Sequence, residues 1–307
     1  MNLRTIDRAA PEWPESLRRF TTEQPIRRLF VRGRLLPSGS RSVAVVGSRR
    51  PTAAGVHAAA SISRGLVEAG FTVVSGLAMG IDAVAHKAAL DQGGHTVAVL
   101  GCGHDVQYPK VNSALRGRIE ATGTVVSEYE PSVQPQKLHF PERNRIIAGL
   151  SQAVVFVEGG ERSGGLITAH HAFEAGREVF AVPGSIHNPL AAGPNELIRT
   201  CGAKLVTDVA HIIEDLAPGL VWGDDDSGPP AGDPAVNVVE RNVLLFLDDA
   251  PVAPDKLCMQ LRLTWGEAAL ALAGLEARGY ALKRRAGYVL TAAGGRVRAS
   301  LSVDEEG

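Results

Sequence analysis

Residues 139–175 read HFPERNRIIAGLSQAVVFVEGGERSGGLITAHHAFEA and contain the pattern from which the fold can be predicted. A short apolar run, Ala153–Val157, ends in Glu158-Gly159-Gly160, and a helical pattern begins at Leu166, just after Ser163-Gly164-Gly165. A β-branched run that ends in glycines and leads into a helix is typical of the strand-to-helix turn of an open α/β sheet. The first N–H groups of such a helix and the positive end of its dipole favour an anion, so this turn is a candidate phosphate site.

The same alternation of short apolar runs and helical patterns extends to both sides of this stretch. Strands are expected at Val43–Val46, Phe71–Ser75, Thr96–Leu100, Thr124–Ser127, Ala153–Val157, Glu178–Val182 and Lys204–Val206. Helical patterns separate most of them, which predicts an α/β fold with a mostly parallel, extended Rossmann-like sheet and helices on both faces. Nearly every strand ends in Gly or Ser, and ligands bind at that carboxyl edge in open α/β folds.

Composition shifts divide the chain into four segments. Residues 1–38 are Arg- and Pro-rich, and we expect a helix or two that pack onto the next domain through Trp13, Leu17, Ile26, Leu29 and Phe30. Residues 39–218 form the extended Rossmann domain. Residues 219–236 contain an Asp run and a Gly/Pro cluster, which indicate a solvated linker, and residues 237–307 form a second unit.

The second unit has the pattern of a small helical domain. Apolar residues at 243–247, a segment Asp255–Leu261 and a segment Trp265–Arg278 predict three helices, and residues 280–290 predict two short strands around a turn. Three helices followed by a hairpin indicate a winged-helix-like domain. Its nine basic and six acidic residues between 237 and 300 leave both duplex DNA and a protein open as its partner.

Overall composition describes an ordinary globular protein, with 45% hydrophobic residues, 21% charged residues and a net charge of −1. The N-terminus lacks the apolar core of a secretory signal and the apolar runs are too short to span a bilayer, so we expect a cytoplasmic protein. Cys102, Cys201 and Cys258 are odd in number and far apart, which is inconsistent with a disulfide framework. CxxC and HxxxH spacings are absent, so no metal site is expected.

Fingerprints of common cofactors and enzymes are also missing. The sequence contains no GxGxxG, no GxxxxGK[ST] and no GxSxG, so we expect neither NAD nor ATP as a cofactor and no serine hydrolase. Asp82 and His86 are four residues apart on one predicted helix, and we interpret them as a hydrogen-bonded structural pair rather than a catalytic dyad. The chain is therefore expected to bind rather than to catalyse.

Positive charge and small polar residues gather at several of the predicted strand ends. Gly47-Ser48-Arg49 follows the first strand, and Lys110 follows Tyr108-Pro109 in the loop after the third. Glycine permits close approach of a ligand, while serine and arginine can hold a phosphate. Residues 1–50 as a whole carry eleven arginines and four acidic residues, of which Arg49 is the one placed at a strand end.

The segment before the central strand adds an aromatic residue to these cations. Lys137 and Phe140 precede Arg143, Asn144 and Arg145. Unpaired bases stack on aromatic rings while cations hold the phosphates, so this combination favours single-stranded nucleic acid. Successive residues of a helix point in different directions, and we expect Arg143 and Asn144 to face the ligand together with Ser163-Gly164.

In their order along the chain, these motifs resemble the bacterial DNA-processing protein A family, also called DprA or Smf. The resemblance rests on VAVVGSRRPTAAG, VSGLAMGIDAVAHKAAL, TVAVLGCGHDVQYPK, HFPERNRIIAGLS and EGGERSGGLITAHHAFEAGREVFAVPGSI. It covers about residues 12–215 densely and residues 237–290 more loosely, as the C-terminal winged-helix-like domain of the family.

The resemblance implies a function for the chain. Members of the family bind single-stranded DNA without sequence preference, form dimers, protect incoming DNA in natural transformation and load the RecA recombinase, and they are not known as enzymes. The positions that match the family's DNA-binding pocket are Gly47, Ser48, Arg49, Lys110, Lys137, Phe140, Arg143, Asn144, Ser163 and Gly164.

Two other functions compete with this one. Nucleoside-monophosphate phosphoribohydrolases have a similar sheet, but their Pro-Gly-Gly-x-Gly-Thr-x-x-Glu loop is replaced here by residues 158–165, which lack the Pro, the Thr and the final Glu. Alternatively, the Rossmann part is inert and the winged helix binds duplex DNA.

Overall fold

The computed structural model describes residues 2–20, 25–36, 39–217, 237–248, 250–284 and 287–291, together with Gly294, Gly295, Val297 and Arg298. The chain divides into two compact units, Met1–Trp222 and Gly223–Gly307, and each has a hydrophobic core of its own. The linker predicted at residues 219–236 lies outside the described residues.

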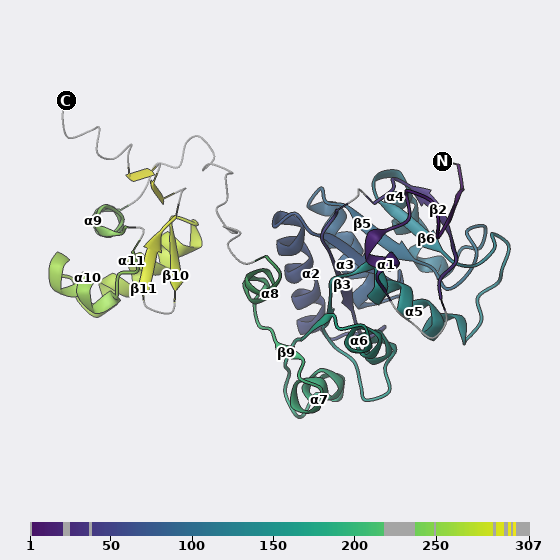
Figure 1. The fold of residues 1–307 in the computed structure, drawn as a ribbon. Helices are drawn as coiled ribbons and strands as arrows, with labels where there is room; N and C mark the ends of the chain where they lie inside the picture. The colour runs from purple at the N-terminus through teal and green to yellow at the C-terminus, as the bar shows by residue number, and fades with distance from the viewer. Residues whose placement is uncertain are drawn as a thin grey trace. The chain divides into compact units, whose positions relative to one another are not determined.

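A nine-stranded sheet forms the centre of the first unit (Figure 1). Its strands are β1 Arg4–Asp7, β2 Arg28–Gly33, β3 Ser42–Val46, β4 Thr72–Ser75, β5 Thr96–Val99, β6 Thr124–Ser127, β7 Ala153–Phe156, β8 Glu178–Ala181 and β9 Lys204–Leu205. They lie in the order β1-β2-β6-β5-β4-β3-β7-β8-β9, and the strands from β6 to β9 in this order are all parallel. The predicted mostly parallel sheet and its seven predicted strands are confirmed.

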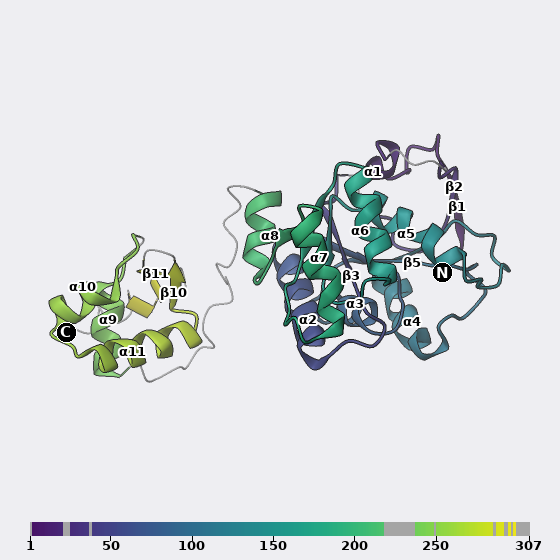
Figure 2. The same cartoon turned by 90° about the horizontal axis from the view of Figure 1, so that it is seen from below.

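Helices cover both faces of this sheet because its buried strands are apolar on both sides (Figure 2). On β3, Val43 and Val45 pack toward α2 and α3, while Ala44 and Val46 pack toward α5 and α6. The first face carries α2 Ala53–Glu68, α3 Ile81–Asp91, α4 Ser113–Thr122 and α8 Val209–Leu216. The second face carries α1 Glu15–Arg18, α5 His139–Leu150, α6 Gly164–Glu174 and α7 Ala192–Thr200. Two short 3₁₀ turns, η1 Lys110–Asn112 and η2 Pro189–Ala191, lie in the loops.

The N-terminal segment differs from the prediction of a helix or two. Apart from α1, which has four residues, its regular structure is β1 and β2, which extend the sheet with antiparallel pairing of β2 on β6. The sequence Arg28–Gly33 alternates too little to show this, since β2 buries Leu29, Phe30 and Val31 in succession. The predicted anchors are nevertheless all buried, so the segment does pack onto the Rossmann domain.

β3 is the point at which the chain changes the side of the sheet to which it adds strands. From β3 the chain adds β4, β5 and β6 on one side, and it then returns to add β7, β8 and β9 on the other. The loops that follow β3 and β7 therefore leave in opposite directions, and an open α/β sheet is expected to bind its ligand at this switch point.

The second unit contains the three helices and the hairpin that the sequence predicts. They are α9 Val238–Phe246, α10 Pro254–Leu261, α11 Trp265–Ala277, β10 Ala281–Arg284 and β11 Gly287–Leu290, with β10 and β11 antiparallel. Val243, Leu257, Leu272 and Leu275 meet in their common core. Across the described ranges of the chain, none of the helices has both the length and the apolar character needed to span a bilayer.

Candidate nucleic-acid interface

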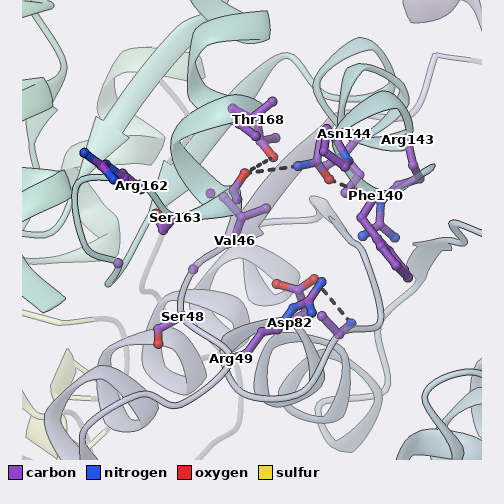
Figure 3. A pocket seen from close by; sticks show the side chains of 18 of the residues that line it. Val46, Ser48, Arg49, Asp82, Phe140, Arg143, Asn144, Arg162, Ser163 and Thr168 are labelled. Atoms are coloured by element: carbon purple, nitrogen blue, oxygen red, sulfur yellow. Dashed lines mark hydrogen bonds between the residues drawn. The ribbon is translucent and has the colours of Figure 1, made fainter. Parts of the chain in front are cut away.

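A pocket of about 830 Å³ opens at the carboxyl ends of β3 and β7, at the switch point of the sheet (Figure 3). The loops after both strands line it, and so do the first turns of α5 and α6. Nine of the ten residues singled out in the sequence meet there: Gly47, Ser48, Arg49, Lys137, Phe140, Arg143, Asn144, Ser163 and Gly164.

Lys110 is the predicted residue that the structure leaves outside this pocket. It begins η1 and is exposed to solvent. Its neighbour Tyr108 does line the pocket, with its ring centroid 5.4 Å from that of Phe140. A contact of Lys110 with a ligand requires that the ligand extend beyond the pocket, and this contact stays a prediction.

Exposed cations and one aromatic ring stand at the rim. The guanidinium carbon of Arg49 lies 5.3 Å from the centroid of the Phe140 ring, so cation and ring form one surface. Lys137 is exposed just before α5, and Arg162 is exposed in the loop between β7 and α6. In the described part of the chain these three side chains have no hydrogen bond or ion pair, so a phosphate can reach them directly, which suits a polyanion that binds and leaves.

Arg143 lies deeper and is 5% exposed. It donates hydrogen bonds from Nη1 to the carbonyls of Gly76, at 2.7 Å, and of Val99, and from Nε to Asn144 Oδ1. The guanidinium thus bonds to the backbone at the carboxyl ends of β4 and β5 and forms the floor of the pocket. Its direct contact with a ligand stays a prediction, since three of its hydrogen bonds already go to the protein.

The next two residues of α5, Asn144 and Arg145, point in different directions, as the sequence predicted. Asn144 faces the pocket and donates from Nδ2 to the carbonyl of Gly164 at 3.0 Å, where Thr168 also donates (Figure 3). Arg145 does not line the pocket and pairs with Glu128 at 2.7 Å. Asn144 therefore joins the first turn of α6 to α5.

The start of α6 keeps its character of an anion site. Ser163 is the N-cap residue, yet its side chain makes no capping hydrogen bond and its Oγ is buried without a partner. The helix also begins with two glycines, of which Gly165 has no room for a Cβ atom because that atom would lie 2.4 Å from the Phe156 ring. The backbone N–H end of the helix and the positive end of its dipole thus face the pocket uncovered.

Four cationic side chains, Arg49, Lys137, Arg143 and Arg162, line the pocket against a single carboxylate, Asp82. Burial lowers the pKa of Arg143 to about 10, and the Asp82 carboxylate opposes part of that shift, so Arg143 is charged at neutral pH. Burial raises the pKa of Asp82, while Arg143 and two backbone N–H groups act in the opposite direction. The electrostatic potential inside the pocket is accordingly positive.

Sequence reasoning missed several lining residues. Arg162 lies between the glycines of the quoted stretch, and its position within an anion-binding loop was the available signal. Asp82 and Thr168 come from α3 and from the second turn of α6, and tertiary packing alone brings them to the pocket.

Asp82 and His86 are not the hydrogen-bonded pair that their spacing indicated. Asp82 accepts hydrogen bonds from the backbone N–H groups of Gly76 and Ala78, whereas His86 Nδ1 lies 2.7 Å from Thr96 Oγ1. Both residues are structural. Asp82 bonds to the backbone just after β4, whereas His86 bonds to the first residue of β5.

Glu158, the carboxylate of the glycine-rich loop, has a bracing role. It accepts hydrogen bonds from Thr52 N and Thr52 Oγ1 at 2.9 and 2.6 Å and from Asn188. These contacts place it at the start of α2, outside the lining of the pocket. Among the residues that the structure describes, no group of three or more His, Cys, Asp or Glu side chains could hold a metal ion.

Fold and site together define a Rossmann-like protein with a cationic pocket at the switch point of its sheet. The chain matches the family described as DNA recombination-mediator protein A over residues 4–217, and it belongs to that family. The resemblance found in the sequence is thereby confirmed.

Individual relatives match over the Rossmann part. The chain is 44% identical over 189 residues to DNA processing protein DprA of Bacillus subtilis (strain 168), which covers 61% of this chain and 63% of the relative. It is 47% identical over 206 residues to Protein Smf of Escherichia coli (strain K12), which covers 67% of this chain and 54% of the relative. The match thus spans between about half and two thirds of the length of these relatives.

Two solved structures share the fold. The crystal structure of DNA processing protein A from Streptococcus pneumoniae has a TM-score of 0.66 and 43% identity, and the match covers 70% of this chain and 75% of that one. DNA processing protein A from Helicobacter pylori, described for its unique single-stranded DNA binding mode, has a TM-score of 0.62 and 26% identity, with 70% and 96% covered.

Two buried histidines of the Rossmann unit predict how stability depends on pH. Burial, assisted by Arg143, lowers the pKa of His86 to about 3, and burial lowers that of His104 to about 4. Unfolding exposes both rings, which then take up protons below their ordinary pKa of about 6.5. Stability is therefore complete above about pH 6.5 and falls as pH drops toward 4.

Urea unfolding between pH 5 and 8 measures this dependence. His86→Gln is expected to lower stability at pH 7 but to reduce the loss between pH 7 and pH 5. An unchanged pH slope in the variant would show that His86 is not the group that takes up the proton.

Proposed function

We propose that this chain binds single-stranded DNA without sequence preference in the switch-point pocket, and that it does so without catalytic turnover. The observation that carries the proposal is the joint presence of an uncovered helix start, exposed cations and the Phe140 ring in one pocket. Each of these groups recognises a part that all nucleotides share, namely the phosphate or the flat face of the base.

Charge arrangement supports a polymer over a single nucleotide. The exposed cations Arg49, Lys137 and Arg162 are distributed along the rim on three different loops, whereas Lys110 stands farther out. A chain of phosphates engages several separated cations at once, and each additional contact adds affinity together with salt dependence. The single-stranded DNA binding described for the Helicobacter pylori relative is in agreement with this arrangement.

Membership of a recombination-mediator family supports the biological part of the proposal. The chain protects incoming DNA in the cytoplasm during natural transformation and loads RecA recombinase onto it in homologous recombination. It acts as a homodimer, which presents two pockets to one strand and raises the effective affinity for long DNA.

For the second unit, the exposed face of α11 favours a protein partner over duplex DNA. Residues 265–277 contain no lysine or arginine. Trp265 and Leu270 are instead 60% and 76% exposed on this helix, and Met259 of α10 is 80% exposed. A helix that reads the major groove needs side chains that hydrogen-bond to base edges and cations that neutralise phosphates, and this face lacks them.

Arg49→Ala tests the proposed pocket. Its loss is expected to weaken binding to oligo-dT and to mixed-sequence strands alike, and to reduce the salt slope of the affinity by about one phosphate contact. Fluorescence anisotropy over a salt series measures both quantities. Arg50→Ala is the matched control, since Arg50 is an exposed neighbour that does not line the pocket. Equal effects of the two variants would contradict a specific role for Arg49.

Phe140→Leu separates stacking from charge. Loss of the ring is expected to cost about 1–3 kcal/mol of binding free energy, as for other base-stacking residues, while the salt slope stays at its wild-type value. The same anisotropy series serves here. A fall in the slope would show instead that the substitution has displaced Arg49 from its place over the ring.

RecA loading requires an assay of its own. Adding the wild-type chain is expected to shorten the lag before RecA hydrolyses ATP on single-stranded DNA, and Arg49→Ala is expected to leave the lag longer because less DNA is delivered. If both proteins shorten the lag equally, the DNA pocket is not used in loading.

A further inference from the structure

The loop Gly76–Gly80, between β4 and α3, lies directly behind the DNA pocket. Ala78 lines the pocket, and Gly76, Ala78 and Met79 line a smaller apolar recess beside it. The residues of this loop are small or apolar, so none of them was a candidate for contact with a ligand. Its conformation nevertheless requires support from buried polar side chains.

Leu77 holds a left-handed backbone conformation, with φ of 56°. This conformation is unfavourable for a residue with a Cβ atom, so neighbouring contacts must stabilise it. Its side chain provides one such contact, since Leu77 is 1% exposed and packs with Leu100, Ile119 and Val125. Hydrogen bonds to the loop backbone provide the rest.

Two buried side chains, one an acceptor and one a donor, form hydrogen bonds with the backbone of the loop. Asp82 Oδ2 accepts from the N–H groups of Gly76, at 3.1 Å, and of Ala78, at 3.4 Å. Asn112 Nδ2 donates to the carbonyls of Leu77, at 2.9 Å, and of Ala78, at 3.1 Å. Asp82 and Asn112 are 6% and 9% exposed, so water cannot readily replace these bonds.

The far end of the loop supports the backbone of Arg49. Ile81 N donates to the carbonyl of Ser48 at 3.1 Å. Gly80 approaches so closely that an added Cβ would lie 2.2 Å from the Ser48 carbonyl oxygen and 2.8 Å from the Cα atom of Arg49. A shift of the loop therefore moves Ser48 and Arg49, and with them the cation over the Phe140 ring.

Asn112 also belongs to the same 3₁₀ turn as Lys110. Through this residue the loop after β5 is bound to the loop after β4, which in turn supports the loop after β3. Three neighbouring strand ends are thus connected in series, by the Asn112 side chain and by the backbone hydrogen bond from Ile81 to Ser48.

We propose that Asp82 and Asn112 are positioning residues of the DNA site. They hold the Gly76–Gly80 loop, in which Leu77 has a left-handed conformation, and through this loop they fix Arg49 at the rim of the pocket. This inference rests on the proposed DNA binding. It assigns Asp82, the one carboxylate in a cationic pocket, a role as an organiser of that pocket rather than as a ligand or an acid catalyst.

Single substitutions measure the effect on affinity. Asp82→Ala and Asn112→Ala each remove two hydrogen bonds to the loop, and each is expected to weaken oligo-dT binding about tenfold. Asp82→Asn is the conservative variant, because its amide oxygen can still accept both bonds that Oδ2 receives, and it is expected to restore most of the affinity. Wild-type affinity in both alanine variants would overturn the proposal.

A double-mutant cycle with Arg49→Ala shows whether the effect passes through Arg49. In the Arg49→Ala background, Asp82→Ala is expected to weaken binding by less than about twofold, because the group that it positions is already absent. Full additivity of the two losses overturns the proposal. Failure of the wild type to bind, or an Arg49→Ala variant without effect, would instead overturn the proposed function itself.

Hydrogen exchange in the absence of DNA separates positioning from general destabilisation. Asp82→Ala is expected to accelerate exchange of the amides of residues 48–50 and of Ile81, with little change at the start of α6. His86→Gln, on the same helix, is the control for lost stability, because its hydrogen bond goes to Thr96 and not to the loop. It is expected to leave DNA affinity unchanged and to accelerate exchange evenly across the Rossmann unit rather than selectively at residues 48–50 and Ile81. Uniform acceleration throughout the Rossmann unit in Asp82→Ala would overturn the proposal.

Discussion

The buried guanidinium of Arg143 is the interaction on which the geometry of the site depends. A cation removed from water is stable only when its N–H groups find acceptors and its charge finds a counter-charge. The carbonyls of Gly76 and Val99, the amide of Asn144 and the nearby carboxylate of Asp82 meet these requirements. Because these partners lie at the ends of β4 and β5, Arg143 places α5 across the carboxyl edge of the sheet. Phe140 and Lys137, just upstream, thereby reach the rim, and Asn144 reaches α6.

Charged groups in this region divide into two populations with different roles. Arg143 and Asp82 are buried, and their partners are protein atoms, so they determine where the loops lie. Arg49 and Arg162 are exposed and can exchange water and counterions for phosphates. Releasing condensed counterions supplies much of the affinity for a polyanion, and this requires cations that are accessible. Because Arg143 and Asp82 already hold the loops through buried hydrogen bonds, we expect DNA binding to require little further ordering of the loops that carry the exposed side chains.

The starts of α2 and α6 satisfy the same electrostatic preference in two ways. Both follow strands that flank the switch point, and both present N–H groups and a positive dipole end. At α2, Thr52 caps the helix and the Glu158 carboxylate binds beside it, so the protein supplies its own anion. At α6, Ser163 leaves its helix uncapped and the neighbouring residues are glycines. We therefore expect an external phosphate to bind at α6 rather than at α2.

The seven parallel strands of the sheet, and nine of the ten residues predicted for the pocket, could be read from the sequence because these features are local. Apolar runs, glycines at strand ends and cations beside them are all readable within a few residues. Three features could not be read in this way: β2 pairs antiparallel with β6, Lys110 stands outside the pocket, and Asp82 turns away from His86 toward the Gly76–Gly80 loop. Each of these depends on contacts between segments far apart in the chain or on the direction in which one side chain leaves its helix. The spacing of residues encodes neither the long-range contacts nor the side-chain directions. A buried polar group takes whichever partner the packing of the surrounding elements brings within hydrogen-bonding distance.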